Sequence, residues 1–226
     1  MNCGTKIVFL FGFLLVAVLG FSQDEYYNQV DNQGRKIGKW KAEFENGMLR
    51  YEGQFRNDRP YGEFRHYFNT GELRAINLYS MNGKVAHNQT FSSDGTLLAE
   101  GKYINQKKDS TWRFYSDIDG VLISEEDYHI DMLYGEVKNY YPENGSLAEI
   151  TYYNNGKKEG LWKRYFPDGS LMTQGLYKND LLDGALIIYH PNGNIQICGQ
   201  YEMGVRNGTW LTYDQDGELI DEEVFD

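Results

Sequence analysis

GLWKRYFPDGSL, residues 160–171, holds the signals that decide the fold of this chain. An Asp-Gly pair is typical of a tight hairpin turn. The aromatic residues before it and the Leu that follows favour extended strands over helix. The stretch therefore predicts two antiparallel strands that meet at Asp168-Gly169.

The same turn recurs every 24 or 25 residues along the chain. Seven of the eight copies are Asn-Gly or Asp-Gly, and such pairs suit a two-residue turn in which both residues adopt positive φ. We therefore predict an all-β fold, an elongated array of eight antiparallel hairpins that form one long twisted or curled sheet. The turn glycines are Gly47, Gly71, Gly95, Gly120, Gly145, Gly169, Gly193 and Gly217.

Downstream of the turn glycine, two registers each hold one type of residue in all eight repeats. An aliphatic residue lies two residues on, and an aromatic residue lies eight residues on, although aromatic residues make up only 15% of the chain. This regularity is the sequence signature of a repeat protein. The aromatic positions are Phe55, Tyr79, Tyr103, Tyr128, Tyr153, Tyr177, Tyr201 and Phe225.

The four Trp residues, Trp40, Trp112, Trp162 and Trp210, share a third register. With a two-residue loop at Asp168-Gly169, Phe166 would lie opposite Leu171, and Trp162 opposite Gly175. The same pairing places Trp40 over Gly53 and Leu186 over Gly199, where a large side chain fills the gap above a cross-strand glycine. We therefore expect one apolar face, and an opposite mixed face with Lys163, Tyr165 and Gln174.

The third repeat is the expected irregularity. Asn88 stands where the other repeats have Trp, Phe, Val or Leu. A second turn with glycines closes each unit, as in residues 156–160, but here the closing glycine is missing from Val85-Ala86-His87. The fourth repeat opens with Ser110 in its place.

The N-terminal segment predicts export. Lys6 precedes an apolar run over residues 7–20, and small residues precede Gln23, so residues 1–22 read as a signal peptide cleaved near Ser22-Gln23. An uncleaved anchor is the alternative. We expect residues 23–37 to form an N-terminal cap strand and residues 38–226 to form the eight repeats, with no membrane segment after cleavage. The predicted location is the periplasm, the cell envelope or the extracellular space.

The net charge of −11 narrows the class of partner. An acidic surface repels phosphate backbones, so nucleic acid is not expected and a basic protein is favoured. Cys198 is the one cysteine left after cleavage, so no intrachain disulfide can form. Its side chain serves either as a small apolar group, or as a reactive thiol or an intermolecular bridge.

YEGQFRNDRPYGEF, residues 51–64, resembles the MORN repeat, and residues 160–171 resemble its bacterial variant. The resemblance extends over most of residues 28–226. It implies an elongated hairpin array. Bacterial proteins of this kind are often labelled YwqK-type antitoxins, and eukaryotic members are associated with membranes and protein assembly. Kinship of fold is a weak guide to function.

No catalytic pattern is evident. His66, His87, His129 and His190 fall in different registers. Glu52, Glu100, Glu125 and Glu222 share one register, which could bind a cation but reads better as a solvated face, since other residue types interrupt it. We therefore predict no enzyme activity, no metal and no cofactor.

The sequence favours an exported scaffold that binds another protein, with antitoxin activity as one form of it. The alternative is a glycan- or lipid-binding protein that uses an exposed aromatic face. Because the most regular aromatic residues pair with glycines, they are expected to hold the sheet together. Binding residues should then be those that vary between repeats.

Overall fold

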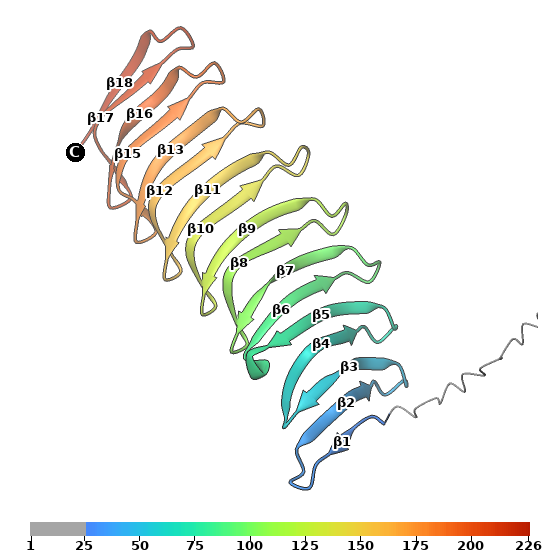
Figure 1. The fold of residues 1–226 in the computed structure, drawn as a ribbon. Coiled ribbons are helices and arrows are strands. Elements are labelled where there is room, and N and C mark those ends of the chain that lie inside the picture. Colours follow the sequence, from blue (N-terminus) through green and yellow to red (C-terminus); the bar gives the residue numbers. More distant parts are fainter. Residues whose placement is uncertain (1–25) are drawn as a thin grey trace, which may run out of the picture.

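The structure is a computed structural model that describes residues 26–226, so the predicted signal peptide lies outside it. These residues form one sheet of 18 strands, each antiparallel to its neighbours. Figure 1 shows the strands stacked in chain order, each bowed across the long axis. The strands are β1 (Gln29–Val30), β2 (Lys36–Glu43), β3 (Leu49–Arg56), β4 (Arg59–Tyr67), β5 (Leu73–Ser80), β6 (Val85–Phe91), β7 (Leu97–Ile104), β8 (Lys107–Tyr115), β9 (Leu122–His129), β10 (Met132–Tyr140), β11 (Leu147–Asn154), β12 (Lys157–Tyr165), β13 (Leu171–Lys178), β14 (Leu181–Leu182), β15 (Gly184–Tyr189), β16 (Ile195–Glu202), β17 (Val205–Tyr213) and β18 (Leu219–Phe225).

The predicted all-β array of eight hairpins is confirmed. The hairpins are β2–β3, β4–β5, β6–β7, β8–β9, β10–β11, β12–β13, β15–β16 and β17–β18. The two further strands are short. β1 pairs with β2 inside the segment predicted as a cap, and β14 is a fragment that precedes β15. In the described part of the chain no helix is long and apolar enough to cross a membrane.

The predicted geometry of the Asn-Gly and Asp-Gly turns is wrong. Only their glycines have positive φ, as in Gly169 at 87°. Gly169 N–H donates to Phe166 O at 2.8 Å, which closes a three-residue loop with a bulge at the glycine. Asp168 serves instead through its side chain, which accepts the Ser170 N–H at 2.8 Å. The extra loop residue makes Tyr165, rather than Phe166, the partner of Leu171.

The two-residue turns with positive φ at both positions occur on the opposite edge of the sheet. They are Asn57-Asp58, Asn105-Gln106, Ile130-Asp131, Asn155-Gly156, Asn179-Asp180 and Met203-Gly204. In five of the six turns the second residue donates its N–H to a carbonyl before the preceding hairpin's first strand or at its start, as Asp58 does to Lys36 O at 3.1 Å; in Asn105-Gln106 the first residue donates instead, Asn105 to Lys84 O at 2.6 Å. Asp58 Oδ1 also accepts the Lys36 N–H at 2.8 Å. These turns therefore join consecutive hairpins.

A third residue with positive φ recurs near the start of the strand that follows each two-residue turn. It is Gly62 in β4, and Ser110 replaces glycine in β8 with a φ of 62°. The strand pairing shifts beside it, which marks a bulge. Ala86 does not adopt positive φ, and β5 and β6 pair without a shift. Where other repeats place residues in a bulge, repeat three places them in the turn. Its turn therefore covers residues 81–84 and includes the 3₁₀ turn η1 (Met81–Gly83). The predicted irregularity of repeat three is confirmed.

The buried side chains lie in the Trp register and beside it. Trp112, Trp210 and Phe64 are 2%, 3% and 4% exposed. The predicted Cα pairings Trp40–Gly53 and Leu186–Gly199 are present, but the ring that covers each glycine belongs to the following hairpin. A Cβ at Gly53 would lie 2.4 Å from the Phe64 ring, and one at Gly199 would lie 2.2 Å from Trp210. The glycine–ring contact therefore joins neighbouring repeats.

Candidate functional site: a gap in the ring row of repeat three

Aromatic rings from successive strands touch edge to face along the apolar side of the sheet. Phe64 lies between two such rings, with centroid distances of 5.2 Å to Phe55 and 5.2 Å to Tyr79. Trp112 meets Tyr103 in the same way at 4.8 Å. Such contacts stabilise a sheet beyond the area that they bury. We call this series of contacts the ring row.

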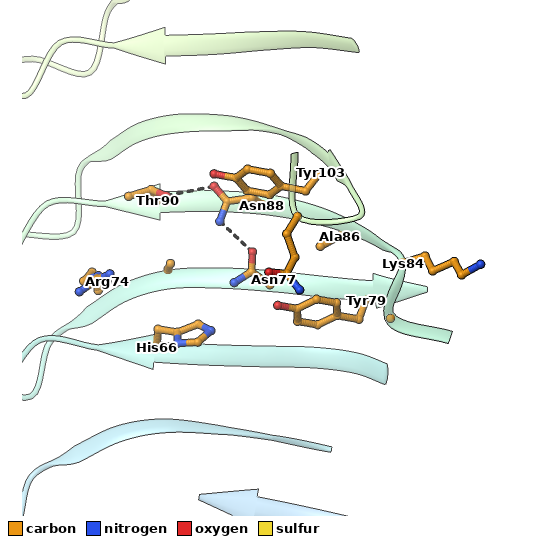
Figure 2. Close-up of a pocket in the computed structure, with 12 residues that line it drawn as sticks. His66, Arg74, Asn77, Tyr79, Lys84, Ala86, Asn88, Thr90 and Tyr103 are labelled. Atoms are coloured by element: carbon orange, nitrogen blue, oxygen red, sulfur yellow. Dashed lines mark hydrogen bonds between the residues drawn. The ribbon is translucent and has the colours of Figure 1, made fainter. Parts of the chain in front are cut away.

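The ring row is interrupted at Asn88 by a polar side chain, whereas Val137 and Leu186 replace the ring with aliphatic side chains further along. Asn77 on β5 pairs with Asn88 and stands where several repeats have glycine. Both members of the glycine–ring contact are therefore missing at this place in the sheet. Asn88 Nδ2 donates instead to Asn77 Oδ1 at 2.9 Å, and Thr90 Oγ1 donates to Asn88 Oδ1 at 3.0 Å (Figure 2). A flat amide pair thus takes the place of a large ring.

A hollow of about 380 Å³ opens above this amide pair. Figure 2 shows Tyr79 and Tyr103 near one end of the pair and His66 and Arg74 towards the other. The volume lies within the usual range for ligand pockets. The hollow is lined by His66, Arg74, Ala75, Asn77, Tyr79, Gly83, Lys84, Ala86, Asn88, Thr90, Tyr103 and Gln106.

The lining contains no acidic side chain, although the chain as a whole is acidic. Arg74 and Lys84 bring two positive charges, and Asn77 and Asn88 have further amide N–H groups beyond the one already used. Burial raises the pKa of Tyr79 and of Tyr103, so both phenols stay protonated and can donate. The hollow therefore offers mainly donors and positive charge.

Burial, and secondarily the charge of Arg74, lowers the pKa of His66. The folded protein then holds a proton at His66 less readily than the unfolded chain does. The stabilisation from a neutral His66 is present above a pH of about 6.5 and is lost as the pH falls below that value.

We expect the urea midpoint of the wild type to fall as the pH is lowered from about 7.5 to about 5.5, and to fall less for His66→Gln. His87→Gln, at an exposed position on β6, is the control and should keep the wild-type profile. Identical profiles for all three proteins would contradict the assignment.

The opposite face is organised by hydrogen bonds between tyrosines and acidic side chains. Tyr67, Tyr115 and Tyr140 donate to Glu52, Glu100 and Glu125 at 2.7, 2.9 and 2.8 Å. Three of the four glutamates that share a register are thus held by phenols. Within residues 26–226, no three or more His, Cys, Asp or Glu side chains are grouped so that they could hold a metal ion.

The two long edges of the sheet differ in charge. The eight Gly-turn loops, which lie between paired strands on one edge, carry ten acidic residues and no Lys or Arg. On the other edge, several strands begin with cations, which lie near the turn carboxylates Asp58, Asp131 and Asp180, so charges of both signs are present there. The acidic loop residues are Glu45, Glu72, Asp94, Asp117, Asp119, Glu143, Asp168, Asp214, Asp216 and Glu218; the cations are Lys36, Arg59, Lys107, Lys108, Lys157, Lys158 and Arg206. We call these the acidic edge and the basic edge.

The structure places the predicted repeat residues in the framework of the sheet. The Trp residues and the aromatic residues eight positions after each turn glycine lie in or beside the ring row, and the turn glycines lie on the acidic edge. Tyr79 and Tyr103 also line the hollow. Sequence reasoning did not find the hollow itself. Its signal was present in Asn77 and Asn88, which interrupt two registers in the same repeat.

Comparison with known families fits this architecture. The MORN repeat variant family matches residues 36–57, 158–179 and 182–203, which are three separate segments of the array. These segments are therefore similar to MORN repeats. The comparison with curated proteins gave no match.

Proposed function

We propose that this chain is an exported, non-enzymatic scaffold that binds another protein along its repeat array. The observation that carries the proposal is the hollow in the ring row, a depression lined mainly by hydrogen-bond donors. Stacked repeats create extended surfaces, which repeat proteins use for binding. The similarity of three segments to MORN repeats supports the same class of function.

The acidic edge supports a basic partner. Its ten carboxylates lie in loops without any Lys or Arg, so their field is not locally neutralised. Charges of one sign along an edge steer an oppositely charged protein and act mainly on the association rate. An antitoxin that masks a basic toxin is one form of this proposal.

Glycan binding through exposed aromatic faces has weaker support. Trp112 and Trp210 are 2% and 3% exposed, and their rings lie against glycines of the preceding strand. The faces of these two Trp rings are therefore covered by the sheet itself. A sugar platform needs such faces open to solvent.

The test is capture of a saturable partner from envelope and secreted fractions by the full-length chain. The acidic-edge variant neutralises Glu45, Asp117, Glu143 and Asp216, for which no turn-forming side-chain hydrogen bond is found among the described residues, to Gln or Asn. We expect it to bind the captured partner roughly three- to tenfold more weakly at low salt, and the difference to shrink at high salt. The control, Lys107→Gln with Lys157→Gln on the basic edge, should not weaken binding. Failure to capture a saturable partner, or equal loss in both variants, would contradict the proposal.

A further inference from the structure

We propose that the hollow in repeat three is a site for an aromatic ring next to a carboxylate, both supplied by the partner protein. In this arrangement the partner's ring occupies the position that Trp or Phe fills in other repeats. This inference rests on the proposed function, because it names the group by which the partner is anchored. Three independent features of the described chain point to this ligand.

The first feature is the pair of tyrosines beside the gap. Phe64 fills the corresponding position one repeat earlier, where it contacts Phe55 and Tyr79 edge to face at 5.2 Å each. Tyr79 and Tyr103 both line the hollow, but the residue between them in the ring row is Asn88. A ring bound above Asn88 would meet Tyr79 and Tyr103 as Phe64 meets its two neighbours. The ring row would then run unbroken from Trp40 to Trp112.

The second feature is Lys84. Four residues before each Trp stands a cation, whereas Pro60, Leu133 and Leu182 precede Phe64, Val137 and Leu186 at the same spacing. Three of these cations lie over the ring of their own Trp: Lys36 Nζ at 4.5 Å, Lys108 Nζ at 4.8 Å and Arg206 Cζ at 4.3 Å from the ring centroid.

Lys84 occupies the position of the cation that precedes Trp in other repeats, although Asn88 stands in place of the Trp here. In the described part of the chain no ring lies beneath its ammonium, and Figure 2 shows the side chain extending away from the amide pair. Lys84 lies in the turn over residues 81–84 and is exposed, so its side chain is free to swing over a bound ring and make the cation–π contact that three of its counterparts already make.

The third feature is the chemistry of the lining. Arg74, the free amide N–H groups of Asn77 and Asn88, and the two phenols all donate hydrogen bonds, and no carboxylate competes for them. A ligand carboxylate satisfies such a group of donors, because hydrogen bonds to an ionised acceptor are stronger than neutral ones. The ring thus fills the space, and the carboxylate pairs with Arg74.

The test uses N-acetyl-tryptophan as probe, with N-acetyl-tryptophanamide as the neutral analogue and N-acetyl-alanine as the ringless acid. Binding to the full-length chain is followed by NMR through the side-chain amide signals of Asn77 and Asn88. We expect saturable shifts with the acid, a preference for acid over amide on the order of tenfold, and no saturation with N-acetyl-alanine. Equal affinity for acid and amide, or no saturable shift with N-acetyl-tryptophan, would overturn the assignment.

Two variants locate the site. Arg74→Gln should abolish the preference for the acid, whereas Arg50→Gln should keep it, because Arg50 occupies the same register one repeat earlier and lies over the Tyr51 ring instead. The double variant Asn77→Gly with Asn88→Trp rebuilds the regular glycine–ring contact, fills the hollow and should lose probe binding. If probe binding is unchanged in both Arg74→Gln and the double variant, the site lies elsewhere.

The captured partner separates this inference from the proposed function. Loss of the partner in the double variant supports the anchoring role of the hollow. If the double variant still captures the partner with wild-type affinity, the scaffold function stands and this inference fails. A partner that binds neither protein defeats the proposed function itself, whatever the small probe does.

Discussion

Trp112→Ala should lower the free energy of unfolding of the central repeats by about 3–5 kcal/mol, the largest loss expected for a single side chain in this sheet. The Trp112 ring is 2% exposed, covers Gly101, meets Tyr103 at 4.8 Å and donates from Nε1 to Lys102 O at 3.1 Å. Its removal leaves a cavity between two hairpins, and a single-layer sheet has no second layer that could fill it.

The measurement is urea unfolding combined with hydrogen exchange, because an array of repeats need not unfold in one step. Protection should fall first in β7, β8 and β9, the strands that surround Trp112. Trp40→Ala is the matched control, since Trp40 occupies the same register but is only half-buried near the N-terminal end of the array. Equal losses in the two variants would show that burial between repeats does not set the stability.

Gly101→Ala is expected to give the second large effect, a loss of about 1–3 kcal/mol from overpacking. The added Cβ would lie 2.2 Å from the Trp112 ring, and a rigid ring cannot move aside without disturbing the contact with the next hairpin. The loss should appear in the same urea and exchange measurements.

Gly175→Ala is the control for this substitution. An added Cβ would lie 3.0 Å from Leu186 Cδ1, the end of a flexible side chain that can change rotamer, and 3.3 Å from the Trp162 ring, which is farther than the 2.2 Å at Gly101, so the loss should be smaller. Trp112→Leu added to Gly101→Ala copies the Leu186 arrangement and should cost less than the two single losses combined. Additive losses would mean that the two residues do not interact as the geometry indicates.

These two predictions separate what is local from what is not. The pairing of Trp162 with Gly175 was predicted correctly although the loop is one residue longer than expected, because a register shift between Arg164 and Tyr165 offsets the extra residue. Which ring covers a glycine depends on the neighbouring hairpin: the contact was assigned to the wrong strand at Gly53 and Gly199, whereas the Trp162 ring does lie against Gly175. The bulges beside residues such as Gly62 shift the pairing between hairpins, and a pattern within one hairpin does not contain that information.

The turns also show a difference between what the local sequence predicts and what the tertiary structure sets. Asn-Gly and Asp-Gly pairs predicted a turn correctly but not its type, because Asp168 acts by accepting a hydrogen bond rather than by adopting positive φ. The turns with positive φ at both residues include Ile130-Asp131 and Met203-Gly204, where the first residue has little intrinsic preference for that conformation. Their geometry is held by the backbone bonds to the preceding hairpin.

The sequence by itself determined the number of hairpins, the registers and the irregular third repeat, because each depends on residues within one repeat of 24 or 25. Only the tertiary structure decided what that irregularity becomes. Asn77 and Asn88 are 11 residues apart, and the Tyr79 and Tyr103 side chains beside them come from two different hairpins. A hollow exists only where neighbouring strands place these side chains around a missing ring, and the pairing between hairpins, which is not encoded in any single repeat, sets that arrangement.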